Sequence, residues 1–377
     1  MNRFTKLMIV IALSMLVCVS GCKRKDTINN DPNNNDINGL YYGVASDSTF
    51  KIYNQSQLLY ELPYKPYHKN VIVKGNTIYA TIVENNSTNK IMSLWKNGHI
   101  QYNIITTYDV IPRGLCLGGN NIFTTGRIKV TSSDSYCGKV WKNRELLYTL
   151  EIPDGSGFFY TYMAVAVAND VYVSGSYYNN SSLHAIIWKN GNIYFTTEGG
   201  DRDCIRGIGY YNGSLYWYGS EGSSEDIDAH GKIWKDGHVI CDAKEKNWAS
   251  YGDINDAIIY NGDVWAAGFI HIEPGSVSDE GNEGMIGVVW KNGDILYEIS
   301  DKLLTSSYNS NWSEVKLSSI NIIDEDVYVS GIVYGIGGEI TKIWRNGEEY
   351  LEINNGIYGV GNIVYLLKNG MNYNDQF

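Results

Sequence analysis

Apolar and polar residues alternate along this chain in short runs that turn residues separate. In the segment from Met163 to Thr197, an apolar run is followed by Asn169-Asp170, a second run rich in valine and tyrosine, a polar stretch, a third run ending at Trp188, a Lys-Asn-Gly turn and a fourth run. Valine, isoleucine, tyrosine and tryptophan favour strands, and Asn-Asp or Asn-Gly pairs favour tight hairpins. The segment therefore predicts four antiparallel β-strands.

The same four-strand pattern recurs along the chain at intervals of roughly 46 to 56 residues. Its third run ends in a tryptophan followed by Lys-Asn-Gly or a close variant, at Trp95, Trp141, Trp188, Trp234, Trp290 and Trp344. Its second run carries an aromatic residue, at Tyr79, Phe123, Tyr172, Tyr216, Trp265 and Tyr328. Copies of one unit must bury their faces against one another, and four-stranded antiparallel units arranged radially make a β-propeller. We expect the six tryptophans to pack between its blades.

Partial copies stand at the two ends of the repeated region, in Leu40–Leu62 and Gly356–Gly370. Together with the six fuller copies, they predict a seven-bladed propeller over residues 40–377, closed by pairing of the chain ends. Eight blades is the alternative. No stretch with helical periodicity follows the first 21 residues.

The chain begins with features of an export signal. Arg3 and Lys6 precede an apolar run that is too short to span a bilayer and that ends in Val-Ser-Gly-Cys at Cys22. This motif resembles a bacterial lipobox, which implies removal of residues 1–21 and attachment of lipid to Cys22. A plain secretory signal with an incidental cysteine is the alternative. Residues 22–39 are basic and then Asn-rich, without aromatic residues, and are expected to form a tether.

The repeated Val-Tyr-Val-Ser-Gly and Trp-Lys-Asn-Gly motifs resemble those of bacterial surface lipoproteins, mostly of unassigned function. The resemblance covers about residues 40–370 and is specific for architecture. It implies a location in the bacterial cell envelope, lipid-anchored, with the outer membrane as the expected site. Whether the domain faces the periplasm or the exterior stays open.

Charge and cysteine content narrow the partners and the chemistry. The formal net charge is −11, and loss of Arg3 and Lys6 would make the mature chain more acidic, which argues against nucleic acid as a partner. Four cysteines remain after Cys22 and are expected to be unpaired, because the strand register keeps them too far apart to bridge: Cys116, Cys137, Cys204 and Cys241.

The loops of the predicted blades differ between their two ends. The first and third connections are tight turns, whereas the second and inter-blade connections are long and variable, which is where binding residues concentrate. Aromatic residues outside the repeat register lie in these long loops and are candidates for stacking on sugars or for protein contact, with packing inside the loops as the alternative: Phe158, Phe159, Tyr160, Trp248, Tyr251, Tyr308 and Trp312.

A ring of polar positions is expected at the start of the innermost strands. Ten residues before each repeat aromatic stand Lys69, Arg113, Tyr162, Arg206, Asn255 and Ser318. Two residues further on stands an apolar layer: Val71, Leu115, Ala164, Ile208, Ala257 and Ile320. Cations that converge at a channel mouth predict a site for an anion such as an acidic sugar, flanked by Trp248 or Trp312. Ion pairing with nearby acids such as Asp109 or Asp203 is the alternative.

No linear motif for catalysis or for a metal is present. The acidic segments Glu221–Asp228 and Asp279–Glu283 keep no metal-loop spacing, so we interpret them as solvated patches and expect neither metal nor cofactor. The sequence therefore favours a membrane-anchored, non-catalytic binding or interaction module for a glycan or a protein on the long-loop face. A polysaccharide-active hydrolase or lyase and an envelope-assembly scaffold are the alternatives, because propeller folds host all three.

Overall fold

The fold is known from a computed structural model of the chain. It describes residues 39–45, 49–63, 70–85, 90–106, 108–129, 136–151, 156–179, 182–200, 203–222, 230–243, 249–272, 284–300, 314–335, 338–353 and 363–367. All of them belong to the unit Ile37–Phe377. The predicted signal peptide, Cys22 and the tether lie outside the described residues.

The described residues form antiparallel sheets of sequential strands, as the repeat predicts. Three sheets come first after the N-terminal strands: β4 (Val71–Lys74), β5 (Thr77–Asn85), β6 (Lys90–Lys96) and β7 (His99–Thr106); β8 (Val110–Gly118), β9 (Asn121–Lys129), β10 (Tyr136–Lys142) and β11 (Glu145–Thr149); and β12 (Ser156–Val167), β13 (Asp170–Asn179), β14 (Ser182–Lys189) and β15 (Asn192–Thr196).

Three further groups of four strands follow in sequence: β16 (Cys204–Tyr211), β17 (Ser214–Glu221), β18 (His230–Lys235) and β19 (His238–Asp242); β20 (Ala249–Tyr260), β21 (Asp263–Ile272), β22 (Gly284–Lys291) and β23 (Asp294–Ile299); and β24 (Glu314–Ile323), β25 (Asp326–Gly335), β26 (Gly338–Arg345) and β27 (Glu348–Ile353). The last two groups are joined into one sheet by a single parallel pair, Met285 with Glu314.

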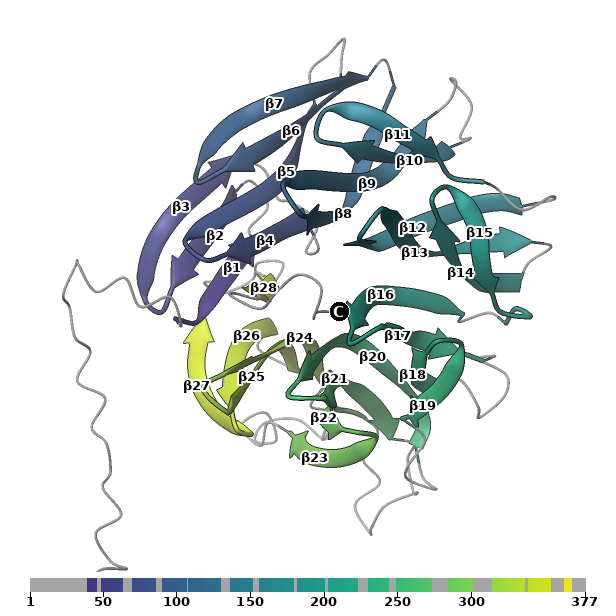
Figure 1. The fold of residues 1–377 in the computed structure, drawn as a ribbon. Coiled ribbons are helices and arrows are strands. Elements are labelled where there is room, and N and C mark those ends of the chain that lie inside the picture. Colours follow the sequence, from purple (N-terminus) through teal and green to yellow (C-terminus); the bar gives the residue numbers. More distant parts are fainter. Residues whose placement is uncertain are drawn as a thin grey trace, which may run out of the picture. The chain divides into compact units, whose positions relative to one another are not determined.

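The two ends of the repeated region share one further sheet. Strand β28 (Ile363–Leu367) pairs antiparallel with β1 (Tyr41–Ala45), which continues through β2 (Thr49–Asn54) to β3 (Gln57–Pro63). In Figure 1 the groups of strands in this unit follow one another around a common centre. The first strand of each group of four lies innermost, and β28 takes that place beside β1. The prediction of an all-β, propeller-like fold of four-stranded antiparallel units is confirmed at this level.

The core lies in the seams between sheets rather than inside any one sheet. One cluster of buried side chains contains Cys116 and Phe123 from the β8–β11 sheet with Phe159 and Trp188 from the β12–β15 sheet. Comparable clusters join each of the other successive groups, including β24–β27 with β28 and β1, and β1–β3 with β4–β7. Each unit therefore completes its hydrophobic burial only against its neighbours.

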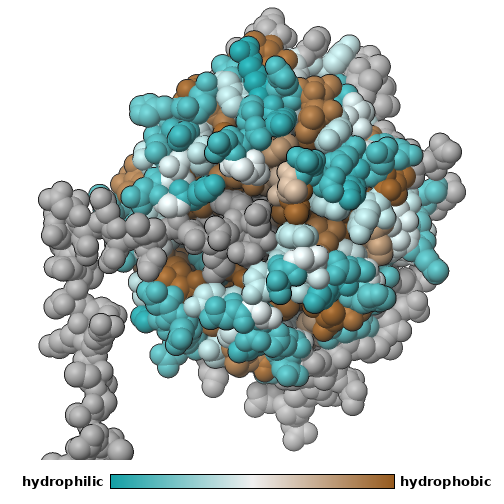
Figure 2. Space-filling view, viewed as in Figure 1, coloured by the Kyte–Doolittle hydropathy of each residue, from teal (hydrophilic) through white to brown (hydrophobic). Residues whose placement is uncertain are grey.

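The repeat tryptophans belong to this core, as expected. Trp141, Trp188, Trp234, Trp290 and Trp344 are buried, and Trp95 is half-buried. The four remaining cysteines are free thiols, three of them buried. Figure 2 shows a largely hydrophilic surface with separate hydrophobic patches. Exposed apolar side chains occur on outermost strands, where Ile105 and Leu146 are examples. No helix among the described residues is long and apolar enough to cross a membrane.

Candidate ligand site on the inner strands

The polar ring positions coincide with a repeated irregularity of the innermost strands. In β8, β12, β16, β20 and β24 the pairing register with the second strand shifts at the same place, so that the inner strand carries extra residues there. The residues inside these bulges include Arg113, Tyr162, Arg206, Asn255 and Ser318. Five of the six predicted ring positions thus occupy equivalent places in the sheets.

Their position along the strand differs from the prediction. Tyr162 and Asn255 lie in the middle of β12 and β20 rather than at the start, because these inner strands begin earlier, at Ser156 and Ala249. The sequence count therefore identified structurally equivalent residues but placed Tyr162 and Asn255 too close to the start of their strands. Lys69, Trp248 and Trp312 lie outside the described residues.

A glycine on the second strand leaves room for the inner-strand backbone at each bulge. It is the final residue of the Val-Tyr-Val-Ser-Gly motif and its equivalents, and it pairs with the inner-strand residue just before the extra position: Gly126, Gly175, Gly219, Gly268 and Gly331. A Cβ at any of the five would overlap a backbone carbonyl of the inner strand, for example that of Cys204 at Gly219. The motif is therefore the sequence signature of the bulge, and its recurrence could have revealed it.

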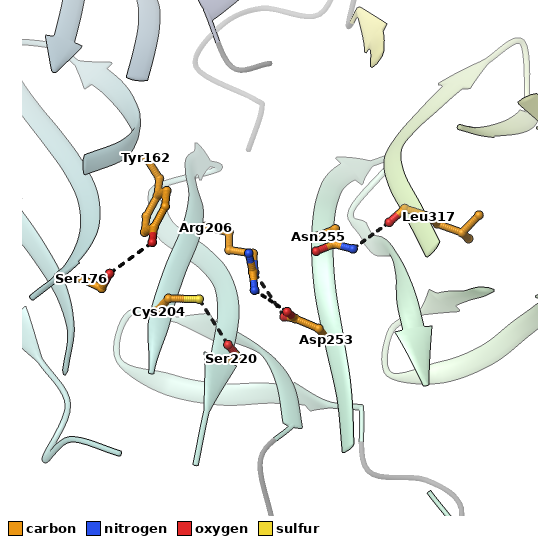
Figure 3. A network of polar contacts seen from close by, with 8 residues as sticks. All are labelled: Tyr162, Ser176, Cys204, Arg206, Ser220, Asp253, Asn255 and Leu317. Carbon is orange, nitrogen blue, oxygen red and sulfur yellow. Dashed lines mark hydrogen bonds and ion pairs between the residues drawn. The ribbon is translucent and has the colours of Figure 1, made fainter. Parts of the chain in front are cut away.

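Tyr162 stands at the centre of the described polar cluster, which Figure 3 shows in part. Its hydroxyl lies 3.2 Å from Ser176 Oγ. Burial raises the pKa of Tyr162, and Cys204 nearby adds to that rise, while the hydrogen bond with Ser176 and the positive charges of Arg206 and Arg113 oppose it. Both arginines therefore act electrostatically on the same phenol, from β8 on one side and β16 on the other.

Arg206 is held by an ion pair across the seam to the next inner strand. Its Nε donates to Asp253 Oδ1 at 3.2 Å and its Nη2 forms a second, short contact with Asp253 Oδ2. Burial alone would lower the pKa of Arg206, but Asp253 outweighs it and raises the pKa above its ordinary value. The side chain of Arg206 is still 36 % exposed. The pair orients this guanidinium, whose positive charge still acts on Tyr162.

The acid that pairs with Arg206 differs from those the sequence suggested. Asp109 lies 3.3 Å from Lys90 Nζ. Asp203 accepts hydrogen bonds from Thr197 Oγ1 at 2.5 Å and from the Gly222 N–H at 2.9 Å. Asp253 was missed because it lies on the neighbouring repeat, and only the sheet arrangement brings it to Arg206.

Asn255 bonds to the next inner strand, and Ser318 bonds to the second strand of its own sheet. Asn255 Nδ2 donates to the Leu317 carbonyl at 2.8 Å, as Figure 3 shows. Ser318 Oγ lies 3.1 Å from Ser330 Oγ within its own sheet. The ring therefore has two characters: a cationic and phenolic arc on β8, β12 and β16, and a neutral amide and hydroxyl arc on β20 and β24.

The apolar layer two residues beyond the ring is buried, as predicted. All six of its members have buried side chains: Val71, Leu115, Ala164, Ile208, Ala257 and Ile320. The polar cluster consequently rests on a dry base, in which charge interactions are screened less than in water.

The aromatic residues at the start of β12 have separate environments. Phe158 is 51 % exposed, Phe159 is buried against Trp188, and Tyr160 is half-buried. Tyr251 pairs through its backbone with His271 in β21, and Tyr308 lies outside the described residues. The loop placement predicted for these aromatics is therefore wrong, because β12 and β20 begin early enough to include Phe158, Phe159, Tyr160 and Tyr251. Phe159 packs in the core between two sheets, and Phe158 is largely exposed.

The predicted acidic patch falls mostly on residues 223–229 and 273–283, outside the described residues. His230 beside it is buried, with its Nδ1 3.4 Å from Asp242 Oδ1. Within the described ranges no group of three or more His, Cys, Asp or Glu side chains is arranged to hold a metal ion.

Comparison with known proteins gives likeness in structure alone. No family model and no curated protein matches the sequence. Similar solved structures include the Dos1 propeller (12 % identity, covering 83 % of this chain and 77 % of that one, TM-score 0.44). They also include the acylaminoacyl peptidase of Pyrococcus horikoshii (13 %, 81 % and 48 %, 0.46) and the dihydro-heme d1 dehydrogenase NirN (9 %, 85 % and 64 %, 0.48). This chain spans about half of the peptidase. At such identities and TM-scores, these likenesses assign no activity to it.

Proposed function

We propose that this chain is a lipid-anchored, non-catalytic binding module of the bacterial cell envelope that holds an anionic glycan at the inner-strand ring. The observation that carries the proposal is the bulge repeated on five successive inner strands, which sets Arg113, Tyr162 and Arg206 at equivalent positions over a dry layer. Two guanidinium groups flanking a phenol suit a carboxylate with neighbouring hydroxyls.

The scaffold of this module is a seven-bladed propeller closed by its chain ends. Three observations support closure. β28 pairs with β1, Ser319 Oγ on β24 accepts from the Leu366 N–H at 2.9 Å, and apolar clusters link successive groups of strands in a cyclic order that includes the β28–β1 sheet. Pairing with β28 covers the edge of β1, and closure of the ring would keep the ring residues in fixed relation.

The test is binding of acidic and neutral oligosaccharides to the full chain. Oligogalacturonides and galactose oligomers of equal length are titrated calorimetrically against the wild-type protein and Arg113→Ala. The variant is expected to lose about tenfold or more of the affinity for the acidic ligand, because a charge-assisted hydrogen bond is removed. Arg144→Ala, an exposed arginine in an outer turn, is the matched control and should bind as wild type does.

Arg206 needs a paired variant. Arg206→Ala alone would strand the Asp253 carboxylate, so Arg206→Ala is combined with Asp253→Ala. Equal binding of acidic and neutral sugars, or affinity that survives both the Arg113 change and this double change, would contradict an anionic-glycan site. Release of new reducing ends during the titration would instead indicate a polysaccharide-cleaving enzyme.

A further inference from the structure

Arg127 on β9 is clamped between two aromatic rings next to the ring site. Its guanidinium carbon lies 4.7 Å from the ring centroid of Tyr136 on β10 and 4.7 Å from that of Tyr160 on β12. Its Nη1 donates to the Phe159 carbonyl at 3.1 Å. Two cation–π contacts and one hydrogen bond fix the plane of the guanidinium across the seam between two sheets.

The charge of Arg127 has no acidic partner among the described residues. Its contacts there are two neutral rings and one carbonyl, and its Nε is buried without a hydrogen-bond partner. Arg206, in contrast, is offset by Asp253. A half-buried cation without a counter-charge is costly, and an arriving anion would relieve that cost.

The clamp is continuous with the ring site. The rings of Tyr160 and Tyr162 are stacked, with centroids 6.4 Å apart and planes 14° from parallel. The positive charges of Arg113 and Arg206 act in turn on Tyr162, where they oppose the rise of its pKa. Arg113 and Arg206 thus act on Tyr162, whereas Arg127, on β9 of the neighbouring sheet, contacts Tyr160. Phe158, half exposed at the same end of β12, adds apolar surface there.

We infer that the clamped Arg127 is a second anion subsite of the same binding site, so that the ligand is an acidic oligosaccharide with at least two acidic residues rather than a single acidic sugar. One acidic group contacts Arg113 and Arg206 beside Tyr162. The other contacts Arg127, and the sugar between them crosses the Tyr160–Tyr162 pair. The inference rests on the proposed function, because it places one end of the ligand at the ring.

The experiment compares galacturonic acid as monomer and as trimer on the full chain. On the wild-type protein, the trimer is expected to bind at least about tenfold more tightly than the monomer, with an affinity that falls more steeply as salt is added. Arg127→Gln keeps a donor for the Phe159 carbonyl but removes the charge. It should weaken trimer binding about tenfold and leave monomer binding unchanged, whereas Arg113→Ala should weaken both.

The outcomes separate the two claims. If both sugars bind, Arg113→Ala weakens both, and Arg127→Gln affects neither or both equally, the second subsite is wrong while the proposed function stands. If neither sugar binds the wild-type protein, both are wrong. Should Arg127→Gln fail to fold, as thermal unfolding would show, equal affinity and equal salt dependence of monomer and trimer on the wild-type protein would still overturn the inference. Arg144→Ala is again the control.

Discussion

The asparagine of the Trp-Lys-Asn-Gly motif has two structural roles. Its backbone takes a left-handed conformation, with φ of 49° at Asn97 and 53° at Asn190, which a tight hairpin requires and asparagine tolerates. Its side-chain oxygen also accepts from the backbone N–H of a residue on the second strand, as Asn190 does from Val171 at 2.9 Å. Aspartate does the same at Asp236, which explains the one variant copy with that residue. The sequence predicted the hairpin, but the second role requires the sheet.

The first prediction concerns the glycine opposite each bulge. Gly219→Ala should lower the free energy of unfolding by about 1–3 kcal/mol, because its Cβ would overlap the Cys204 carbonyl and force the bulge apart. Urea unfolding followed by tryptophan fluorescence measures this. Gly119→Asn, in the turn between β8 and β9, is the control and should change stability far less, because the space around Gly119 is open and asparagine tolerates its φ of 59°.

A Gly219→Ala protein as stable as wild type would show that the bulge accommodates a Cβ without cost. It would contradict our explanation of the glycine that ends the Val-Tyr-Val-Ser-Gly motif.

Bulges also explain why sequence could locate the ring residues but not their partners. Counting along a strand assumes strict alternation of side chains, and an extra residue breaks it. Arg113, Tyr162 and Arg206 were found because the break recurs at the same place in each copy. The sequence did not reveal the Asp253 partner or the Tyr136–Arg127–Tyr160 clamp, because each brings together side chains from adjacent repeats. Which side chains meet there depends on the bulge and on the twist of two sheets.

The second prediction concerns strand β28. Deleting residues 356–377 should lower the unfolding midpoint, since Leu366 and Leu367 are buried and each such side chain contributes about 1.5–3 kcal/mol. It should also expose the edge of β1, which normally pairs with β28 from Tyr41 to Ala45, and promote association of the chain. Urea unfolding and sedimentation measure the two effects.

Deletion of residues 371–377 alone is the control for β28. It spares the pairing with β1 and should leave both midpoint and sedimentation as in the wild-type protein. If the longer deletion does the same, β28 does not close the molecule, and the proposed seven-bladed ring loses its main support.

At the scale of the whole molecule, the sequence predicted architecture far better than ligand. Each copy of a repeated unit adopts the same fold, so each copy independently predicts the same strands and turns. A ligand site has no such redundancy. The ring positions are not copies of one residue, since arginine, tyrosine, asparagine and serine occupy them, and under the proposed function these differences would set the specificity. Repetition therefore predicts the fold from the sequence, but it does not predict a site whose residues differ from copy to copy.

The third prediction concerns the membrane anchor. If Val-Ser-Gly-Cys is a lipobox, Cys22→Ala should abolish incorporation of radiolabelled palmitate in the bacterial host and shift the protein from the membrane fraction to the soluble fraction, because the remaining chain carries no other acyl group. Cys18→Ala, inside the predicted signal, is the matched control and should keep both label and membrane association. The alternative of a plain secretory signal predicts no label on the wild-type protein. Label that persists in Cys22→Ala would place the lipid elsewhere. Since the proposed binding site is formed by residues between Arg113 and Asn255, the Cys22→Ala protein should still bind the acidic trimer with unchanged affinity, which separates the anchor from the module that it carries.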